Sequence, residues 1–464
     1  MAEGQGDRPP PSVDDAALQQ FLLQLGSALT ATGEAVNEVQ DHLRAVAIAY
    51  GRHDARFVVL PTFLVIALDP RRPATLEPTS QLRGVLRLDQ TSGLFDILKL
   101  AMKAEIDPEE GSRQVLEIIT RPPHHRPVLT LLGYMILTAG ICLILQPTWS
   151  DVALAAGFGL IVGVLTHLAG RWAPAQTLLP VAAAFTVSAL TFLLANQGWA
   201  NANLRSMVAP LITFLPGAAL TMSVIELSAG QMVSGASRLV SGALQLVLLA
   251  FGIVIAADAF GFPVTEVLAS SPQNLIGWWA PWLGVIVFGI GVAVFNSAPS
   301  GSLPGLFLVL LVAFVGQQLG SALLGGYAGG FIGALAMTIT ARLIERTKFG
   351  PPALVSFLPG FWLLVPGALG LIGLTEYITS GPVLGVQSLL GTLAAMVAIA
   401  VGVLCGYLLV DAVNPLYRHA VRPALDLLPF QLSSPDRVPS PADRGAEDLT
   451  RDEDDYIDGT EDEK

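Results

Sequence analysis

Long apolar runs fill the chain after residue 127 and constrain its fold more than any other feature. A helix needs about 20 residues to cross roughly 30 Å of hydrocarbon. Ten stretches have this length: Val128–Gln146, Val152–Arg171, Leu178–Asn196, Met207–Leu227, Leu239–Ala259, Trp279–Asn296, Leu303–Gly320, Ala322–Ile344, Leu354–Ile378 and Val383–Asp411. With 52% hydrophobic and 13% charged residues, a chain of 464 residues has too little polar surface to fold in water. The sequence therefore predicts a polytopic α-helical membrane protein.

The residues before these runs have a different pattern. Capping residues and a 3.6-residue apolar period predict helices over 14–31, Glu34–Tyr50, Gln90–Lys103 and Pro108–Thr120. The run Phe57–Leu68 is too short to span a bilayer and is rich in β-branched residues, so it predicts a buried strand with a bulge or break at Pro61. A further strand is expected near Gly84–Leu88. Residues 14–120 are therefore expected to form a small α/β or α+β domain.

The distribution of charge completes the expected domain order. Most of the net charge of -12 lies in residues 443–464, which hold eleven acidic residues against three basic ones. We expect a disordered N-terminus over 1–13, the soluble domain over 14–120, a basic linker over 121–127, five spans in 128–259, an extracytoplasmic loop over 260–278, five spans in 279–411, and a tail over 412–464 that is acidic and disordered from about 433.

Basic residues near the span ends predict the orientation. The side that carries Arg121 and Arg126 would also carry Arg171, Arg238, Arg342, Arg346, Lys348, Arg418 and Arg422, whereas only Arg205 falls on the other side. Positive residues favour the cytoplasmic side of a membrane. Both termini and the soluble domain are therefore expected to be cytoplasmic.

One short pattern occurs twice inside the apolar runs. Pro216-Gly217 is followed by Glu226, and Pro366-Gly367 is followed at the same spacing by Glu376. A proline removes one helix hydrogen bond, and the freed carbonyl needs another partner in hydrocarbon. The two copies fall in the fourth and ninth spans, which are equivalent in a repeat of five plus five spans. An odd number per half makes such a repeat inverted, with paired broken helices lining one polar cavity.

Several residues near these breaks are candidates for a substrate or proton pathway. Glu226 and Glu376 could carry a proton or bind an ammonium group, or each could sit at a wetted span end. Arg238 could pair with Glu226, attract a carboxylate, or anchor its helix at the interface. Pro359-Gly360 supplies a further expected break.

The uncharged polar residues and the glycines carry open alternatives. Asn296 and Gln245 could line a path or form hydrogen bonds between helices. Glycines share faces of the second, eighth and tenth spans, which favours close helix packing, although a sliding surface or a homo-oligomer contact has the same pattern: Gly159, Gly163, Gly325, Gly326, Gly329, Gly330, Gly333, Gly402 and Gly406.

Other functional classes lack their usual residues. The sequence contains no zinc-protease, serine-hydrolase or Walker A motif and no basic patch with interleaved aromatics, so it predicts neither an enzyme nor a nucleic-acid partner. No cofactor and no metal site is expected. Cys142 and Cys405 are expected to act as small hydrophobic residues. The acids and histidines of the first domain are expected on an exposed, solvated face: Glu34, Glu38, Asp41, His42, His53 and Asp54.

Short motifs spread over most of the chain resemble a known family. Gly33-x-x-Val36-x-Glu38-Val39, Val59-Leu-Pro61-Thr62, Phe214-Leu-Pro216-Gly217, Phe357-Leu-Pro359-Gly360 and Leu364-Val-Pro366-Gly367 are similar to segments of the bacterial threonine/serine exporters. The resemblance implies a ten-span secondary transporter in the bacterial inner membrane that expels L-threonine and L-serine, driven by the proton gradient. This chain has Val36-Asn37 where members of that family often have arginine.

Two other classes remain as alternatives. A membrane-embedded sensor or regulator would bind a ligand or partner through its cytoplasmic domain. A passive channel would carry flux that does not depend on a pH gradient.

Overall fold

The computed structural model describes residues 14–78, 86–123, 125–145, 148–170, 172–198, 207–262, 276–347, 350–364, 371, 375 and 382–412. The chain divides into two compact units, Met1–Val410 and Asp411–Lys464, and the first unit contains the features below except for Asp411 and Ala412, the last two described residues. The expected disordered N-terminus (1–13), most of the loop over 260–278, and the tail beyond residue 412 lie outside the described residues.

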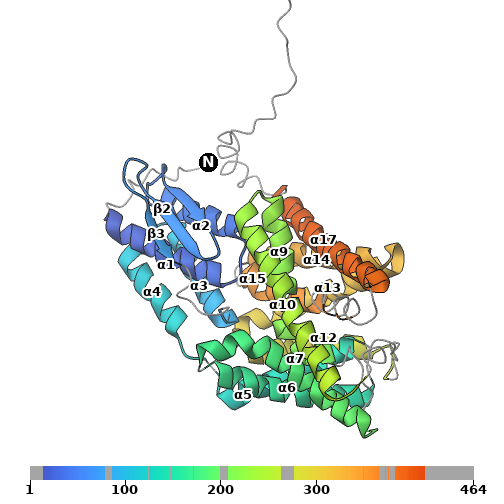
Figure 1. Ribbon diagram of the computed structural model, residues 1–464. Coiled ribbons are helices and arrows are strands. Elements are labelled where there is room, and N and C mark those ends of the chain that lie inside the picture. Colours follow the sequence, from blue (N-terminus) through green and yellow to red (C-terminus); the bar gives the residue numbers. More distant parts are fainter. Residues whose placement is uncertain are drawn as a thin grey trace, which may run out of the picture. The chain divides into compact units, whose positions relative to one another are not determined.

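Residues 14–120, here called the N-terminal region, contain four helices and one sheet (Figure 1). The helices are α1 (Asp15–Ala31), α2 (Val36–Ala49), α3 (Leu88–Ala101) and α4 (Pro108–Thr120), and the strands β1 (Arg56–Val59), β2 (Phe63–Ala67) and β3 (Thr75–Pro78) form an antiparallel sheet in that order. The side chains of Asp14 and Asp107 cap α1 and α4. Gly33 follows α1 with φ of 87°, a conformation that favours glycine.

The strands differ from the prediction in two ways. The run over 57–68, expected as one strand with a bulge or break at Pro61, is broken there and forms a hairpin in which Val59 pairs with Leu64, because Pro61 has no N–H for a sheet ladder. A strand was also expected near Gly84–Leu88. In the part of this stretch that the structure describes the prediction is wrong, because Leu88 is the first residue of α3, and the third strand is Thr75–Pro78. Oε1 of Gln90 accepts a hydrogen bond from the backbone nitrogen of Arg87 at 3.1 Å and so caps the start of the helix.

The N-terminal region has its own hydrophobic core. The apolar sides of α1, α2 and α3 pack with the inward residues of β1 and β2, and the largest fully buried side chains include Phe21, Leu22, Leu43 and Leu64. The three-residue and four-residue apolar spacing read from the sequence therefore corresponds to the buried helix faces.

Helices occupy each of the ten predicted stretches within the described residues. They are α5 (Pro127–Ile144), α6 (Trp149–Ala169), α7 (Ala173–Asn196), η2 (Ala209–Phe214) with α9 (Gly217–Ser228), α10 (Met232–Ala259), α12 (Ala280–Phe295), η3 (Ser300–Ser302) with α13 (Leu303–Leu324), α14 (Gly326–Glu345), α15 (Ala353–Leu364) and α17 (Pro382–Ala412). Eight segments are long and apolar enough to cross a membrane, whereas Ala280–Phe295 and Ala353–Leu364 are shorter.

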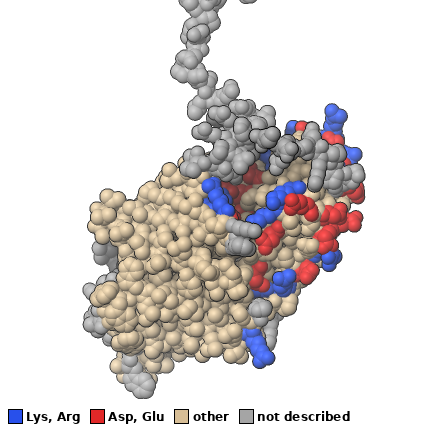
Figure 2. Space-filling view, turned by 180° about the vertical axis from the view of Figure 1, so that it is seen from behind, with Lys and Arg blue, Asp and Glu red and all other residues tan. Residues whose placement is uncertain are grey.

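The surface of these helices is apolar. Leu323, Leu324 and Leu408 are mostly exposed, and Figure 2 shows charged side chains gathered on one part of the molecule beside a broad uncharged face. Contiguous exposed apolar surface of this extent suits hydrocarbon rather than water. The fold is therefore that of a polytopic helical membrane protein.

Close packing of α5 against α12 depends on two glycines from each helix: Gly133, Gly140, Gly284 and Gly291. A methyl group at Gly133 would lie 2.7 Å from the backbone nitrogen of Phe295, and one at Gly284 would lie 2.9 Å from that of Ile144. Residues later in α5 contact residues earlier in α12, so the two helices are antiparallel. Small residues allow this backbone approach.

The glycine faces of the later spans contact helices of the same chain. A methyl group at Gly402 of α17 would lie 3.1 Å from Ala334 of α14, and one at Gly330 would lie 3.0 Å from Ile399. Gly159 of α6 faces Thr138 of α5 in the same way. These faces therefore serve helix packing within the chain.

Candidate functional site

The fourth predicted span is interrupted at Leu215-Pro216. Helix η2 ends at Phe214, Leu215 is extended, and Pro216 precedes the first residue of α9. The carbonyl oxygen of Phe214 accepts a hydrogen bond from Nε2 of Gln245 in α10, at 3.2 Å. Gln245 thus supplies a donor across helices to a carbonyl that the break frees.

Tyr134 of α5 binds the same broken segment from another side. Its fully buried hydroxyl donates to the carbonyl of Pro210 at 2.9 Å and lies 2.7 Å from Oγ1 of Thr213. Because a phenol has one hydrogen, Thr213 donates to the Tyr134 oxygen when Tyr134 donates to Pro210. Tyr134 and Gln245 together hold η2 at the break.

Two buried hydroxyl groups in the first five spans have no hydrogen-bond partner among the described residues. They are Oγ1 of Thr221, just over one turn into α9, and Oγ of Ser188 in α7. A buried hydroxyl without a partner is costly. None of Thr221, Ser188 and Tyr134 was predicted from the sequence as a site residue, although a hydroxyl residue within about a turn of a Pro-Gly break was a usable signal.

Glu226 lies near the end of α9 and its side chain is fully buried. Its Oε1 accepts from the backbone nitrogen of Val36 at 3.1 Å, and its Oε2 accepts from Oγ of Ser234 at 2.8 Å. Nε of Arg238 lies 3.0 Å from Oε1. The carboxylate therefore joins the start of α2 to α9 and α10.

Arg238 extends this contact to Glu34, two residues before the start of α2. Its Nη2 donates to the carbonyl of Glu34 at 3.1 Å. Nε is close to Glu226 but is not aligned for a hydrogen bond, so that part of the contact is an ion pair. Arg238 was expected to pair with Glu226, to attract a carboxylate or to anchor its helix, and in the structure it pairs with Glu226.

Asn296 also lies where the N-terminal region meets the helices. Its carbonyl accepts from the backbone nitrogen of Leu88 at 3.1 Å, and its side-chain Nδ2 is buried without a hydrogen-bond partner among the described residues. Glu226, Arg238 and Asn296 are thus junction residues, whereas Pro216, Gly217 and Gln245 belong to the break.

The polar face of α2 adds a second part to the junction. Glu34, Glu38 and His42 are half-buried, so the expectation of a solvated face is wrong for them, although it holds for the exposed Asp41, His53 and Asp54. Arg342 of α14 lies 3.8 Å from Glu38 and 3.2 Å from Glu345. Polar helix faces read alike in sequence whether water or a polar neighbour covers them.

Electrostatics at this face reflect burial and crowding of charge. Burial raises the pKa of Glu38 above its ordinary value, and the nearby Glu34 carboxylate adds to the rise while Arg342 opposes it. Burial alone would lower the pKa of His42, but the adjacent Glu34 and Glu38 carboxylates raise it above its usual value.

The second half differs from the expectation at Pro359-Gly360. A break was expected there, but α15 continues through Pro359 as an unbroken helix. Phe357 and Phe361 pack edge to face with centroids 4.6 Å apart, and a helix held by such contacts tolerates one missing hydrogen bond. Gly360 lets Met337 of α14 approach the helix. Pro366, Gly367 and Glu376 lie outside the described residues.

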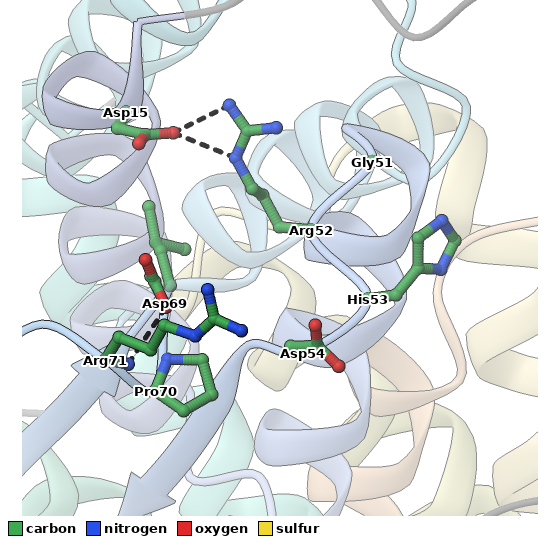
Figure 3. A pocket seen from close by; sticks show the side chains of 9 residues that line it. Asp15, Gly51, Arg52, His53, Asp54, Asp69, Pro70 and Arg71 are labelled. Carbon is green, nitrogen blue, oxygen red and sulfur yellow. Dashed lines mark hydrogen bonds and ion pairs between the residues drawn. The ribbon is translucent and has the colours of Figure 1, made fainter.

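A polar pocket of about 530 Å³ lies in the N-terminal region (Figure 3). The loop Gly51–Asp54, the turn Asp69–Arg71 and Asp15 line it. Nε of Arg52 donates to Asp15 at 2.8 Å. Among the described residues, the carboxylate of Asp54 and the guanidinium of Arg71 have no hydrogen-bond or ion-pair partner, so the pocket offers one free charge of each sign.

The fold and the interrupted span define a polytopic helical membrane protein, and comparison with known proteins gives its family. A family described as "Putative threonine/serine exporter" matches residues 20–259. This chain belongs to that threonine/serine exporter family.

The chain is also similar, at low sequence identity, to curated membrane proteins of yeasts. The chain is 23% identical over 307 residues to a pheromone-regulated membrane protein 10 from Kluyveromyces lactis, covering 64% of this chain and 32% of that protein. It is 22% identical over 370 residues to the protein of that name from Debaryomyces hansenii, covering 76% and 36%. The chain thus spans about a third of the length of these relatives. No solved structure matches it.

Proposed function

We propose that the protein is a secondary active exporter of the small hydroxy amino acids L-threonine and L-serine, coupled to the proton gradient. Membership of an exporter family supports the transport class. The observation that carries the proposal is the interruption of the fourth span at Pro216, where side chains from α5 and α10 hold the freed carbonyls. Irregular backbone at membrane depth is typical of transporter binding sites.

The chemistry around the break suits a zwitterion with a hydroxyl group. The unpartnered hydroxyl of Thr221 can exchange hydrogen bonds with a substrate hydroxyl, and the start of α9 favours a carboxylate through its free N–H groups. The substrate ammonium would bind the carbonyls of the broken segment.

Proton coupling is assigned to Glu226. Its carboxylate holds Arg238 and the N–H of Val36, so a proton on Glu226 would neutralise the group that fixes both. Proton uptake would thereby loosen the junction between the N-terminal region and α9–α10. Glu376 is the equivalent acid in the proposed repeat.

Helix pairing supports the inverted repeat of five plus five spans. The first and sixth spans (α5 and α12) pack antiparallel. The spacing between Gly133 and Gly140 in α5 is the same as that between Gly284 and Gly291 in α12. The fourth and ninth spans (α9 and α15) also contact each other. A two-fold axis brings together the equivalent elements that lie next to it, so these two self-pairings fit such a repeat.

We place both termini on the cytoplasmic side of a bacterial inner membrane, and the junction contacts support a common side for the N-terminal region and three helix ends. Glu226 near the end of α9, Asn296 after α12 and Arg342 near the end of α14 each contact the N-terminal region. The predicted topology places these three helix ends on one side, with the positively charged residues.

Transport by the purified protein in liposomes tests the proposal. We expect counterflow of labelled L-threonine and L-serine that responds to an imposed pH gradient. Thr221→Val, which removes the hydroxyl at nearly constant volume, should lower threonine flux about tenfold or more. Thr186→Val, on an exposed part of α7, is the matched control. Absence of counterflow in the wild type would refute the exporter.

Substitution of the acid tests the coupling separately. Glu226→Gln keeps the shape of the side chain and should abolish proton-coupled efflux while the protein is still expressed. Efflux at the wild-type rate would remove Glu226 from the mechanism. Flux that ignores the pH gradient in the wild type would indicate a passive channel.

A sensor remains the second candidate function because of the polar pocket in the N-terminal region. Asp54 and Arg71 offer a zwitterion two complementary charges. If the protein is a sensor, Arg71→Ala in the full chain will abolish threonine binding, and the wild type will show no counterflow. Counterflow that persists in Arg71→Ala favours the exporter.

A further inference from the structure

Three side chains at the start of α2 converge in a way that transport does not explain. Glu38 and His42 lie four residues apart and so stack along the helix, while Glu34 lies two residues before its first residue. One ligand atom from each lies within 4.8 Å of the other two. They therefore form a cluster of two carboxylates and one imidazole.

Two of these atoms face each other without a hydrogen bond. Nδ1 of His42 lies 3.6 Å from Oε2 of Glu34. Both atoms are buried and neither has a hydrogen-bond partner among the described residues. A hydrogen bond would bring them to about 2.7–3.2 Å, whereas two ligands at 2.0–2.2 Å from one tetrahedral ion are about 3.4 Å apart. Their separation thus suits two ligands of one ion.

We propose that Glu34, Glu38 and His42 bind a divalent transition-metal ion of the zinc class. Imidazole nitrogen with carboxylate oxygen is a donor set that Zn²⁺ accepts, while Mg²⁺ and Ca²⁺ prefer oxygen alone. Two carboxylates balance the charge of a divalent ion. Three protein ligands leave one position for water.

The guanidinium of Arg342 is the feature that opposes a cation here. It lies 3.8 Å from Oε2 of Glu38, but it is also paired with Glu345 at 3.2 Å. Glu38 has two oxygens, so it can bind the ion through one and keep Arg342 on the other. Outer-shell partners of this kind orient ligating carboxylates.

Metal titration of the full-length protein in detergent tests the site. After treatment with a chelator, the protein is titrated with Zn²⁺ by calorimetry and with Co²⁺ by visible absorption, which reports ligand geometry. We expect one ion per chain, displacement of Co²⁺ by Zn²⁺, and no displacement by Mg²⁺ at the same concentration.

Matched variants locate the ion. His42→Ala and Glu34→Gln should each weaken Zn²⁺ binding at least tenfold, and the glutamine variant keeps the backbone carbonyl that Arg238 uses. His53→Ala removes an exposed histidine of the same region and should bind as the wild type does. Gel filtration confirms that each variant is folded.

Two results would overturn the proposal. One is a wild-type protein that binds no Zn²⁺, which would make the His42–Glu34 contact a protonated ion pair only. The other is equal affinity in the wild type and in both ligand variants. Neither result depends on transport activity.

Discussion

Two Pro-Gly pairs in the apolar helices have opposite effects on the backbone. Pro216 separates η2 from α9, and the neighbouring carbonyls receive hydrogen bonds from Tyr134 and Gln245. Pro359 lies inside α15, which continues through it between buried aromatic side chains. The same dipeptide therefore breaks one helix and leaves the other intact.

Neighbouring side chains decide between these outcomes. A proline removes one donor in either case. Donors from other helices stabilise an irregular backbone at Pro216, whereas packing on both sides of Pro359 holds the helix in spite of the missing bond. The region around Pro216 is thus stabilised by polar contacts and α15 by apolar packing.

The largest effect should come from removing the buried acid beyond the first break. Glu226→Leu leaves the half-buried Arg238 with only the carbonyl of Glu34 and takes the acceptor from Val36 and Ser234, and the loss of one partner of such an ion pair costs up to about 3–5 kcal/mol of the free energy of unfolding. Denaturant or thermal unfolding in detergent measures it. Glu110→Gln, which breaks the exposed pair with Arg113, should leave the unfolding midpoint unchanged. A stable Glu226→Leu protein would show that polar contacts do not hold this region.

Removal of the Tyr134 hydroxyl should have the next largest effect. Tyr134→Phe leaves the buried carbonyl of Pro210 and the hydroxyl of Thr213 without this partner, at a cost of about 1–3 kcal/mol. Unfolding of the variant and of the wild type under the same conditions gives the difference. An unchanged midpoint would mean that another group, such as water, satisfies the carbonyl.

Replacement of Pro359 should act in the opposite direction. Pro359→Ala restores an N–H that can donate to the carbonyl of Val355 within α15, which should stabilise the protein by about 1 kcal/mol. Pro216→Ala should bring no such gain, because Pro216 precedes α9. Greater stability of Pro216→Ala than of Pro359→Ala would reverse the comparison.

The smallest effect is expected at Gly360. An added methyl group would meet the flexible end of Met337, which can rotate away, so Gly360→Ala should change stability by less than about 1 kcal/mol. Gly140→Ala is the contrasting control, because its methyl would meet the backbone of Phe288 and cost about 1–3 kcal/mol. Equal costs at the two sites would show that α14 and α15 pack as rigidly as α5 and α12.

Local patterns predicted most of the helices because their signals lie within a few residues. Asp107-Pro108 marks the start of α4, and Thr120 is both its predicted and its observed last residue. The strands were less accurate, because the fate of Pro61 depended on which segment paired with β1. For the candidate site, Glu226 and Arg238 were found from charge in an apolar context, while Tyr134 and Thr221 were missed because hydroxyl residues are common in membrane helices.

The sequence by itself determined the membrane class, the apolar helices and the caps, since length, composition and the 3.6-residue period act within each segment. Only the tertiary structure decided which partners the polar groups have. Glu226 contacts Val36, which lies 190 residues away in the sequence, and Glu38 contacts Arg342, which lies still farther away. Hydrogen bonds and ion pairs depend on atoms within about 3–4 Å, and only the packed fold brings residues so distant in sequence to that range.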